Sequence, residues 1–354
     1  MTPHNILLSF TDLSLILSQS IKKTPDPLRE EPILTAFTSD LVLQFWGVRG
    51  SIAKPPENNE IEDKLVNIIQ KAASVPFSSE SEIREFIRKQ APEERGIIGG
   101  NTSCVYIKTA NSHIIFDAGT GIRPLGETLM EQEFGEGQGV AHIFLSHTHW
   151  DHIAGFPFFK PAYIPGNQIF FYGCHNSLER RISYQQEDEF FPVSLSAMAA
   201  NIDFVNLKKE SSIKIDKIKI SNTMLNHPGG SFGYRVEYKG KSIVYATDSE
   251  YKDVSENKMA KIRKFFAGAD LLIFDSHFTI HESIEKENWG HSTAIQGVHF
   301  AHAAKNPHLV LFHHNPEYSD HELINIYDHA RLYAESQGFD LEITLAYEGL
   351  EFTF

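Results

Sequence analysis

Short apolar runs that end in polar residues recur along the chain and predict a series of buried strands. The clearest run is Ile143–Leu145, which is followed at once by a group of polar residues. Comparable stretches occupy residues 41–46, 105–108, 114–116, 168–172, 243–246 and 309–312. Isoleucines alternate with other residues at 213, 215, 218 and 220, which indicates a hairpin with one buried face. The pattern is therefore typical of a domain rich in short strands.

Helical spacing of apolar residues predicts two amphipathic helices in an insertion at about residues 53–97. The first helix carries apolar residues on one face, namely Ile61, Leu65, Ile68, Ile69 and Ala72. In the second, Ser79 and Glu82 are spaced as a capping box. Such an insertion can cover a pocket, contact a second subunit or pack as ordinary decoration, and the sequence leaves these alternatives open. A further helical stretch is expected at 177–200, with an interruption at Phe190–Pro192.

The first forty residues are expected to form an N-terminal extension to a main domain at 41–354. Prolines at 25, 27 and 32 are typical of a linker. The apolar groups near the start have no positive charge before them, and no run is long enough to span a membrane. We therefore expect neither a signal peptide nor a membrane partner.

The composition fits one substantial domain with an acidic surface. The 354 residues are 41% hydrophobic, and the formal net charge is −14. Because long nucleic acids are bound through basic surfaces that release counterions, this charge argues against a long nucleic acid as partner. A small anionic substrate remains compatible if positive charge is concentrated in a cleft. Two cysteines, Cys104 and Cys174, form no disulfide framework, which is consistent with a cytoplasmic location.

Metal-binding side chains are concentrated in the loop that follows the strand at Ile143–Leu145. They are His147, His149, Asp151 and His152. His147 and His149 project to one side of an extended segment, whereas adjacent residues splay apart, so one tight loop can supply two neighbouring metal ions. Imidazole and carboxylate ligands without a thiolate fit zinc, iron or manganese in a reactive site. The clustering disfavours an interpretation as isolated surface or core histidines.

Three more residues of the same kinds lie beside apolar strands in the second half of the chain. His227 precedes a glycine turn, Asp248 follows the run at 243–246, and His313 directly follows the run at 309–312. His314 is the neighbouring alternative to His313. If these strands end at one edge of a sheet, their polar residues converge with the loop at 147–152.

The motif at 147–152 resembles the signature of the metallo-β-lactamase fold superfamily of binuclear metallohydrolases. Trp46–Ser51, Gly99–Thr102 and Asp117–Gly121 resemble segments of its phosphodiesterase-like branch, although the insertion is longer than the connection typical of that branch. The resemblance spans 41–354. It implies an α+β fold, a four-layer αββα sandwich in which two mixed sheets pack face to face, with helices outside and metals at one edge.

The resemblance also implies a ligand set for two divalent ions. The implied ligands are His147, His149 and His227 for one ion, Asp151, His152 and His313 for the other, and Asp248 as the bridge. We expect zinc, with manganese or iron as alternatives. Asp117 either accepts a hydrogen bond from a ligand histidine or caps its own turn. A homodimer is a further expectation from the resemblance.

The segment Trp289–Thr293 resembles the Gly-His-x-Thr-Ala motif of ribonuclease Z-like phosphodiesterases. It precedes a predicted helix, so His291 would stand at the positive helix end, where an anion is favoured, with Ser292 or Thr293 as the cap. By resemblance, His291 would stabilise developing charge or protonate the leaving oxygen. The alternative is a role in capping alone.

Together these features predict a metal-dependent hydrolase with Asp151 and His291 as catalytic residues. Two ions bridged by Asp248 would lower the pKa of a shared water and yield a hydroxide for in-line attack. Asp151 would orient it, and His291 would face the leaving group. The aromatic stretch Phe156–Phe159 either forms a pocket wall that stacks on a base or packs in the core.

The expected substrate is a small phosphodiester, with a cyclic nucleotide preferred. One alternative is hydrolysis of a carboxylic ester, a lactone or a thioester on the same metals, because one metal set serves several reactions. Another alternative is a non-catalytic sensor that binds a small anion. An enzyme that processes long RNA is the least favoured.

Overall fold

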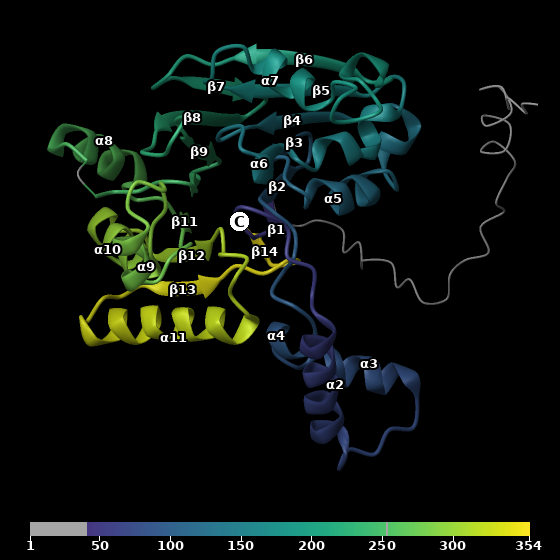
Figure 1. Cartoon of the computed structure of the whole chain (residues 1–354), viewed down its shortest axis with the longest axis vertical. Helices are drawn as coiled ribbons and strands as arrows, with labels where there is room; N and C mark the ends of the chain where they lie inside the picture. The colour runs from purple at the N-terminus through teal and green to yellow at the C-terminus, as the bar shows by residue number, and fades with distance from the viewer. Residues whose placement is uncertain (1–40, 253) are drawn as a thin grey trace, which may run out of the picture. The chain divides into compact units, whose positions relative to one another are not determined.

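In the described part of the chain, two mixed β-sheets of seven strands each form the centre of the fold (Figure 1). The computed structural model describes residues 41–252 and 254–354, so the extension predicted at 1–40 lies outside the described residues. The first sheet contains, in spatial order, β14 (Glu351–Thr353), β1 (Leu41–Gly47), β2 (Cys104–Thr109), β3 (His113–Phe116), β4 (Val140–Phe144), β5 (Gln168–Gly173) and β6 (Asn201–Asn206). The second contains β13 (Glu342–Leu345), β12 (His308–Phe312), β11 (Leu271–Asp275), β10 (Lys241–Ala246), β9 (Phe232–Tyr238), β8 (Ile218–Met224) and β7 (Ser212–Ile215).

The sheets pack face to face because their strands are apolar on alternate positions. Phe116 of β3 and Phe144 of β4 point into the core between the sheets, where both rings contact Tyr234 of β9. Ile115 and Ile143, one residue earlier in each strand, belong to a second core on the other face of the first sheet. This is the period of two that a strand imposes, with both faces covered. The predicted α+β sandwich is confirmed.

Helices pack on the outside of the two sheets. In the first half, α5 (Ile122–Leu129) contacts β1 and α7 (Leu178–Gln185) contacts β6. In the second half, α10 (Ala294–Ala304) and α11 (Asp320–Ser336) contact β12 and β13 respectively, and α8 (Glu256–Phe266) packs on α10. Two short helices, α6 (Trp150–Ile153) and α9 (Ile280–Glu285), lie in connections. Short 3₁₀ turns occupy Glu133–Glu136, Phe156–Phe158, Lys160–Tyr163 and Leu195–Ala197. In the described ranges no helix combines the length and apolar content that crossing a membrane requires.

Local pattern predicted the hairpin well and one helix poorly. β7 and β8 pair antiparallel, with Ile213 opposite Ile220, as expected. The helix expected at 177–200 is too long, because α7 ends at Gln185 and only the 3₁₀ turn at Leu195–Ala197 follows. Pro192 lacks the N–H that a continuing helix would need.

The insertion contains α2 (Asn58–Ala72), α3 (Glu80–Arg88) and α4 (Pro92–Arg95). Only half of the expected capping box forms at α3. The Ser79 hydroxyl accepts a hydrogen bond from the N–H of Glu82, but the Glu82 carboxylate accepts from the N–H of Ser78 instead of Ser79.

A salt bridge ties the insertion to the start of α11. Lys64 Nζ of α2 lies 2.8 Å from Asp320 Oδ2. Leu65 and Ile69 on the apolar face of α2 are 57% and 65% exposed, and α2 buries no residue. The described part of the chain therefore leaves the apolar face of α2 uncovered. The role of the insertion stays a prediction.

Candidate metal centre

Strand ends from both sheets deliver the predicted metal-binding residues to one place. The loop after β4 carries His147 and His149, and α6 continues with Asp151 and His152. In the second sheet, His227 lies between β8 and β9, Asp248 follows β10 and His313 follows β12. β10, β11 and β12 are parallel neighbours, so their carboxyl ends share an edge.

Three strand-end residues adopt the left-handed backbone conformation. Asp117 after β3, Asp248 after β10 and His313 after β12 have φ values of 61°, 56° and 62°. This conformation costs a residue other than glycine about 1–3 kcal/mol and tends to occur at functional sites. Each turn breaks the alternation of its strand and directs the side chain toward the cluster.

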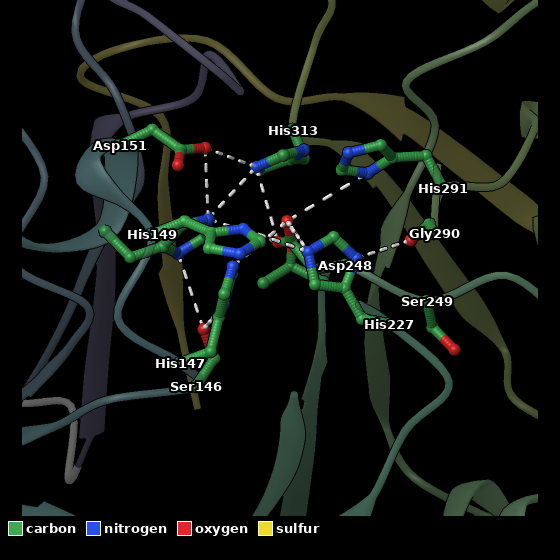
Figure 2. A network of polar contacts seen from close by, with 12 residues as sticks. Ser146, His147, His149, Asp151, His227, Asp248, Ser249, Gly290, His291 and His313 are labelled. Carbon is green, nitrogen blue, oxygen red and sulfur yellow. Dashed lines mark hydrogen bonds and ion pairs between the residues drawn. The ribbon is translucent and has the colours of Figure 1, made fainter. Parts of the chain in front are cut away.

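The predicted ligands form two adjacent groups (Figure 2). In one, ring nitrogens of His147, His149 and His227 gather within 4.8 Å of one another, and His227 Nε2 lies 3.1 Å from His149 Nδ1. The other contains Asp151, His152, Asp248 and His313. There His152 Nε2 and His313 Nε2 are 3.2 Å apart, and Asp151 Oδ2 lies 3.1 Å from each of them.

Asp248 lies between the two groups and turns one carboxylate oxygen toward each. Its Oδ2 is 3.3 Å from both His152 Nε2 and His313 Nε2. Its Oδ1 is 3.8 Å from His147 Nε2 and 3.9 Å from His227 Nε2. This is the arrangement that a bridging carboxylate needs, and it separates the groups in the way that the resemblance implied.

The donor set fits divalent metal ions. His147 Nε2 is buried and has no hydrogen-bond partner among the described residues, as expected of an atom that faces a metal. Burial lowers the pKa of His147 well below its ordinary value, which favours the neutral, ligating form. Burial alone would raise the pKa of Asp248, but His152, His313 and His147 lower it well below the ordinary range. Nitrogen and oxygen donors without a thiolate suit zinc, manganese or iron.

Asp117 holds one of these ligands from behind. Its Oδ2 accepts hydrogen bonds from His152 Nδ1 at 2.8 Å, Ser146 Oγ at 2.8 Å and Tyr245 Oη at 2.7 Å. Its Oδ1 accepts from the N–H of Ser146. Of the two interpretations left open for Asp117, the structure favours the one in which it orients a ligand histidine. Because Nδ1 of His152 donates to Asp117, Nε2 is the nitrogen left for a metal.

His291 faces the cluster and is held by Asp275. Its Nδ1 lies 2.9 Å from Asp275 Oδ2 and 3.9 Å from Asp248 Oδ1. Burial alone would lower the pKa of His291, but Asp275, Asp248 and Asp151 together raise it. Thr293 caps α10 through a capping box, so the cap is Thr293 and not Ser292. His291 takes no part in capping α10, and its ring points toward the metal ligands.

Sequence reasoning missed two residues of this site. Asp275 is the last residue of β11 and follows the apolar run 271–274, the same signal that identified Asp248 and His313. His277 stacks on His291 with ring centroids 4.3 Å apart, and its Nδ1 donates to the carbonyl of His313. No apolar run directly precedes His277, so local pattern could not find it.

Close packing around His313 requires a glycine at position 50. A Cβ atom there would lie 2.4 Å from Cε1 of His313 and 2.9 Å from Nδ1 of His277. The next residue, Ser51, donates its N–H to Asp151 Oδ2 at 2.7 Å. The segment after β1 thus packs on one ligand and hydrogen-bonds to another.

Two open alternatives are decided by geometry. His313 enters the cluster, whereas His314 Nε2 donates to the carbonyl of Ala346 at 2.8 Å. The aromatic stretch at 156–159 packs in the core: Phe156 and Phe159 are fully buried, and only Phe158 is exposed. None of these aromatic residues lines the metal pocket.

The pocket above the cluster is small and polar. It has a volume of about 400 Å³ and is lined by Ser51, Thr148, His149, Trp150, Asp151, Asp248 and His291. Both predicted catalytic residues, Asp151 and His291, therefore face the same space. No lysine or arginine is among these lining residues.

Comparison with known proteins connects this site to a family. The model of the beta-lactamase superfamily domain matches residues 112–314. Ribonuclease Z of Haloarcula marismortui is 24% identical over 301 residues, which cover 71% of this chain and 90% of that protein. Unliganded yeast PDE1 has a similar fold, with a TM-score of 0.59, 12% identity and coverage of 89% of this chain and 100% of that one. The metallo-beta-lactamase fold protein YhfI from Bacillus subtilis gives a TM-score of 0.57, 16% identity and coverage of 89% and 100%.

Proposed function

We propose, from the premise that the chain belongs to the beta-lactamase superfamily and is a metal-dependent hydrolase, that it cleaves small phosphodiesters, with a cyclic nucleotide as the preferred substrate. The observation that carries this proposal is His291. It stands beside the two ligand groups, lines the pocket and has a carboxylate behind it. A charged imidazole in that position suits a substrate that is itself an anion.

The ligand groups divide the work of holding two ions. His147, His149 and His227 would hold one ion, and Asp151, His152 and His313 would hold the other, with Asp248 shared between them. When bound, two divalent ions, zinc in this proposal, supply positive charge against phosphate oxygens and lower the pKa of water toward neutrality. The chain fixes their positions through hydrogen bonds behind the ligands, such as those from His152 Nδ1 to Asp117 and from His227 Nδ1 to the Gly290 carbonyl.

His291 acts on the leaving group. Its Nδ1 proton is committed to Asp275, so its Nε2 is the nitrogen that can give a proton to the departing oxygen. Burial alone would lower the pKa of His291, and Asp275 is the strongest of the carboxylates that raise it, which favours the form of the ring that carries this proton. Asp151 lines the same pocket, and its carboxylate accepts a hydrogen bond from the N–H of Ser51. In this proposal it orients the attacking water.

Pocket size and charge support a small substrate. The volume of about 400 Å³ falls within the range of small-molecule sites, roughly 300–1,000 Å³. The net charge is −14, and no lysine or arginine is in the described pocket lining. Positive charge within the lining would come from the ions and His291, with Arg181 behind Thr148. A long RNA would need more basic surface than this.

The similarity to ribonuclease Z favours RNA as a competing substrate, and one experiment separates the two. The metal-loaded chain would be assayed with bis-p-nitrophenyl phosphate, cyclic nucleotides and a precursor transfer RNA, beside a His291→Ala variant whose metal content is measured. We expect turnover of the small diesters that chelators abolish and that falls strongly in the variant while the metals remain. Cleavage of the RNA alone, or turnover of lactones or thioesters with none of any phosphodiester, would overturn the proposal.

A further inference from the structure

One large apolar side chain of the metal pocket is left in solvent. Trp150 is 82% exposed, more than any other large apolar residue in the described ranges, and it lines the pocket. It sits between His149 and Asp151, one predicted ligand of each ion. Ligand pockets are lined largely by apolar and aromatic side chains, so an exposed indole within the pocket lining is available to a ligand.

The backbone of Trp150 is held in place by the metal ligands on either side. Trp150 is the first residue of α6, and its carbonyl accepts a hydrogen bond from the N–H of Ala154 at 2.7 Å. Asp151 and His152, which follow it, are buried in the cluster. The position of the backbone therefore keeps the indole outside the core, where it lines the pocket.

We propose that Trp150 is a stacking platform for the base of a nucleotide substrate. It would thereby favour substrates that carry a base over those that do not. The inference rests on the proposed function, because it takes the phosphate to lie at the ions and His291. Indole is the best stacking surface among side chains, and bases of every kind present a flat face to it. Among the described residues that line the pocket, Trp150 supplies the only indole or phenyl ring.

The neighbouring polar groups suit the remainder of a nucleotide. Thr148 lines the same pocket, and its hydroxyl accepts a hydrogen bond from Arg181 Nη1 at 2.8 Å. Ser51 adds a second hydroxyl. The metal pocket is therefore lined by His291 for an anion, by two hydroxyl groups for a sugar and by an indole for a base.

The test compares two ligands that differ only in the base. Binding of AMP and of ribose phosphate to the metal-loaded full-length chain would be measured by calorimetry for the wild type, Trp150→Leu and Trp150→Phe. Phe190→Leu is the matched control, since Phe190 is an exposed aromatic residue outside the pocket lining. Metal content would be measured for every variant.

We expect Trp150→Leu to weaken AMP binding roughly 5- to 150-fold, the range for loss of one base stack. Ribose phosphate should bind as before, Trp150→Phe should keep part of the AMP affinity, and Phe190→Leu should change neither. Unchanged AMP binding in Trp150→Leu, equal weakening of both ligands, or no AMP binding to the wild type at millimolar concentration would overturn the proposal. Because binding needs no turnover, failure of phosphodiester hydrolysis would be a separate result that refutes the proposed function and not the stack.

Discussion

Replacing Asp275 with asparagine tests whether His291 acts as a proton donor. Asp275 Oδ2 accepts the proton of His291 Nδ1 at 2.9 Å, and the Asp275 side chain is fully buried. Its other oxygen accepts the N–H of His277 at 3.0 Å. Asparagine has nearly the same shape and removes the charge, but its NH2 group replaces an oxygen that accepts an N–H, so one of these hydrogen bonds is lost as well.

The magnitude follows from the lost charge-assisted hydrogen bond. Such a bond is worth about 1.5–3 kcal/mol, so kcat/KM should fall roughly 10- to 150-fold for a substrate whose leaving oxygen needs a proton. The pH profile should move as well. Asp275 helps to raise the pKa of His291, and the protonated form is the active one. Activity therefore falls as pH rises through that pKa, and in the variant this fall should occur at a lower pH.

The assay compares two leaving groups on the same metal-loaded protein. Cyclic AMP releases an alkoxide that needs protonation, whereas bis-p-nitrophenyl phosphate releases p-nitrophenolate, which leaves without a proton. Asp275→Asn should therefore impair hydrolysis of cyclic AMP much more than hydrolysis of the nitrophenyl ester. His299→Asn is the control, because His299 pairs with Tyr333 on the surface. Equal losses on both substrates with the metals retained would refute proton donation by His291.

Three further predictions concern the ligands and the stability of the fold. Gly50→Ala should displace the His313 ring, which a Cβ atom would approach to 2.4 Å, and lower the metal content found by elemental analysis; Gly96→Ala, where the nearest atom is 3.8 Å away, should not. His314 has a pKa lowered to about 3 by burial and by Arg49, so below its unfolded value of 6.5 the unfolded state binds the extra proton. As the pH decreases from 6.5 to about 3, the unfolding free energy of the metal-free chain should therefore fall by up to about 1.4 kcal/mol per pH unit. Urea titrations should show a flatter decline for His314→Asn, which should still bind two ions; an identical decline would contradict this account. Chelation should lower the midpoint of thermal unfolding and zinc should restore it, since ions that bind only the folded chain stabilise it, and a midpoint indifferent to both would argue against metal binding.

Local sequence was sufficient for the core of the site and for many of the strands, whereas the fold class came from the family resemblance that the motifs carry. The loop at 147–152 carries its ligand residues at a spacing that needs no partner to be recognised, and it follows an apolar strand that must be buried. The same signal, a polar residue at the end of an apolar run, identified Asp248 and His313. It also occurs at Asp275, which could have been found in the same way.

Long-range pairing decided the rest, because contacts between strand ends depend on which strands are neighbours and in which register. His313 lies just beyond β12, where its left-handed backbone turns the ring toward the cluster, whereas His314, one residue later, donates to a backbone carbonyl. The two-sided placement of Asp248 and its left-handed turn likewise exist only once both sheets are assembled. So does the exposure of Trp150, because an indole in a sequence is equally compatible with a core and with the mouth of a pocket.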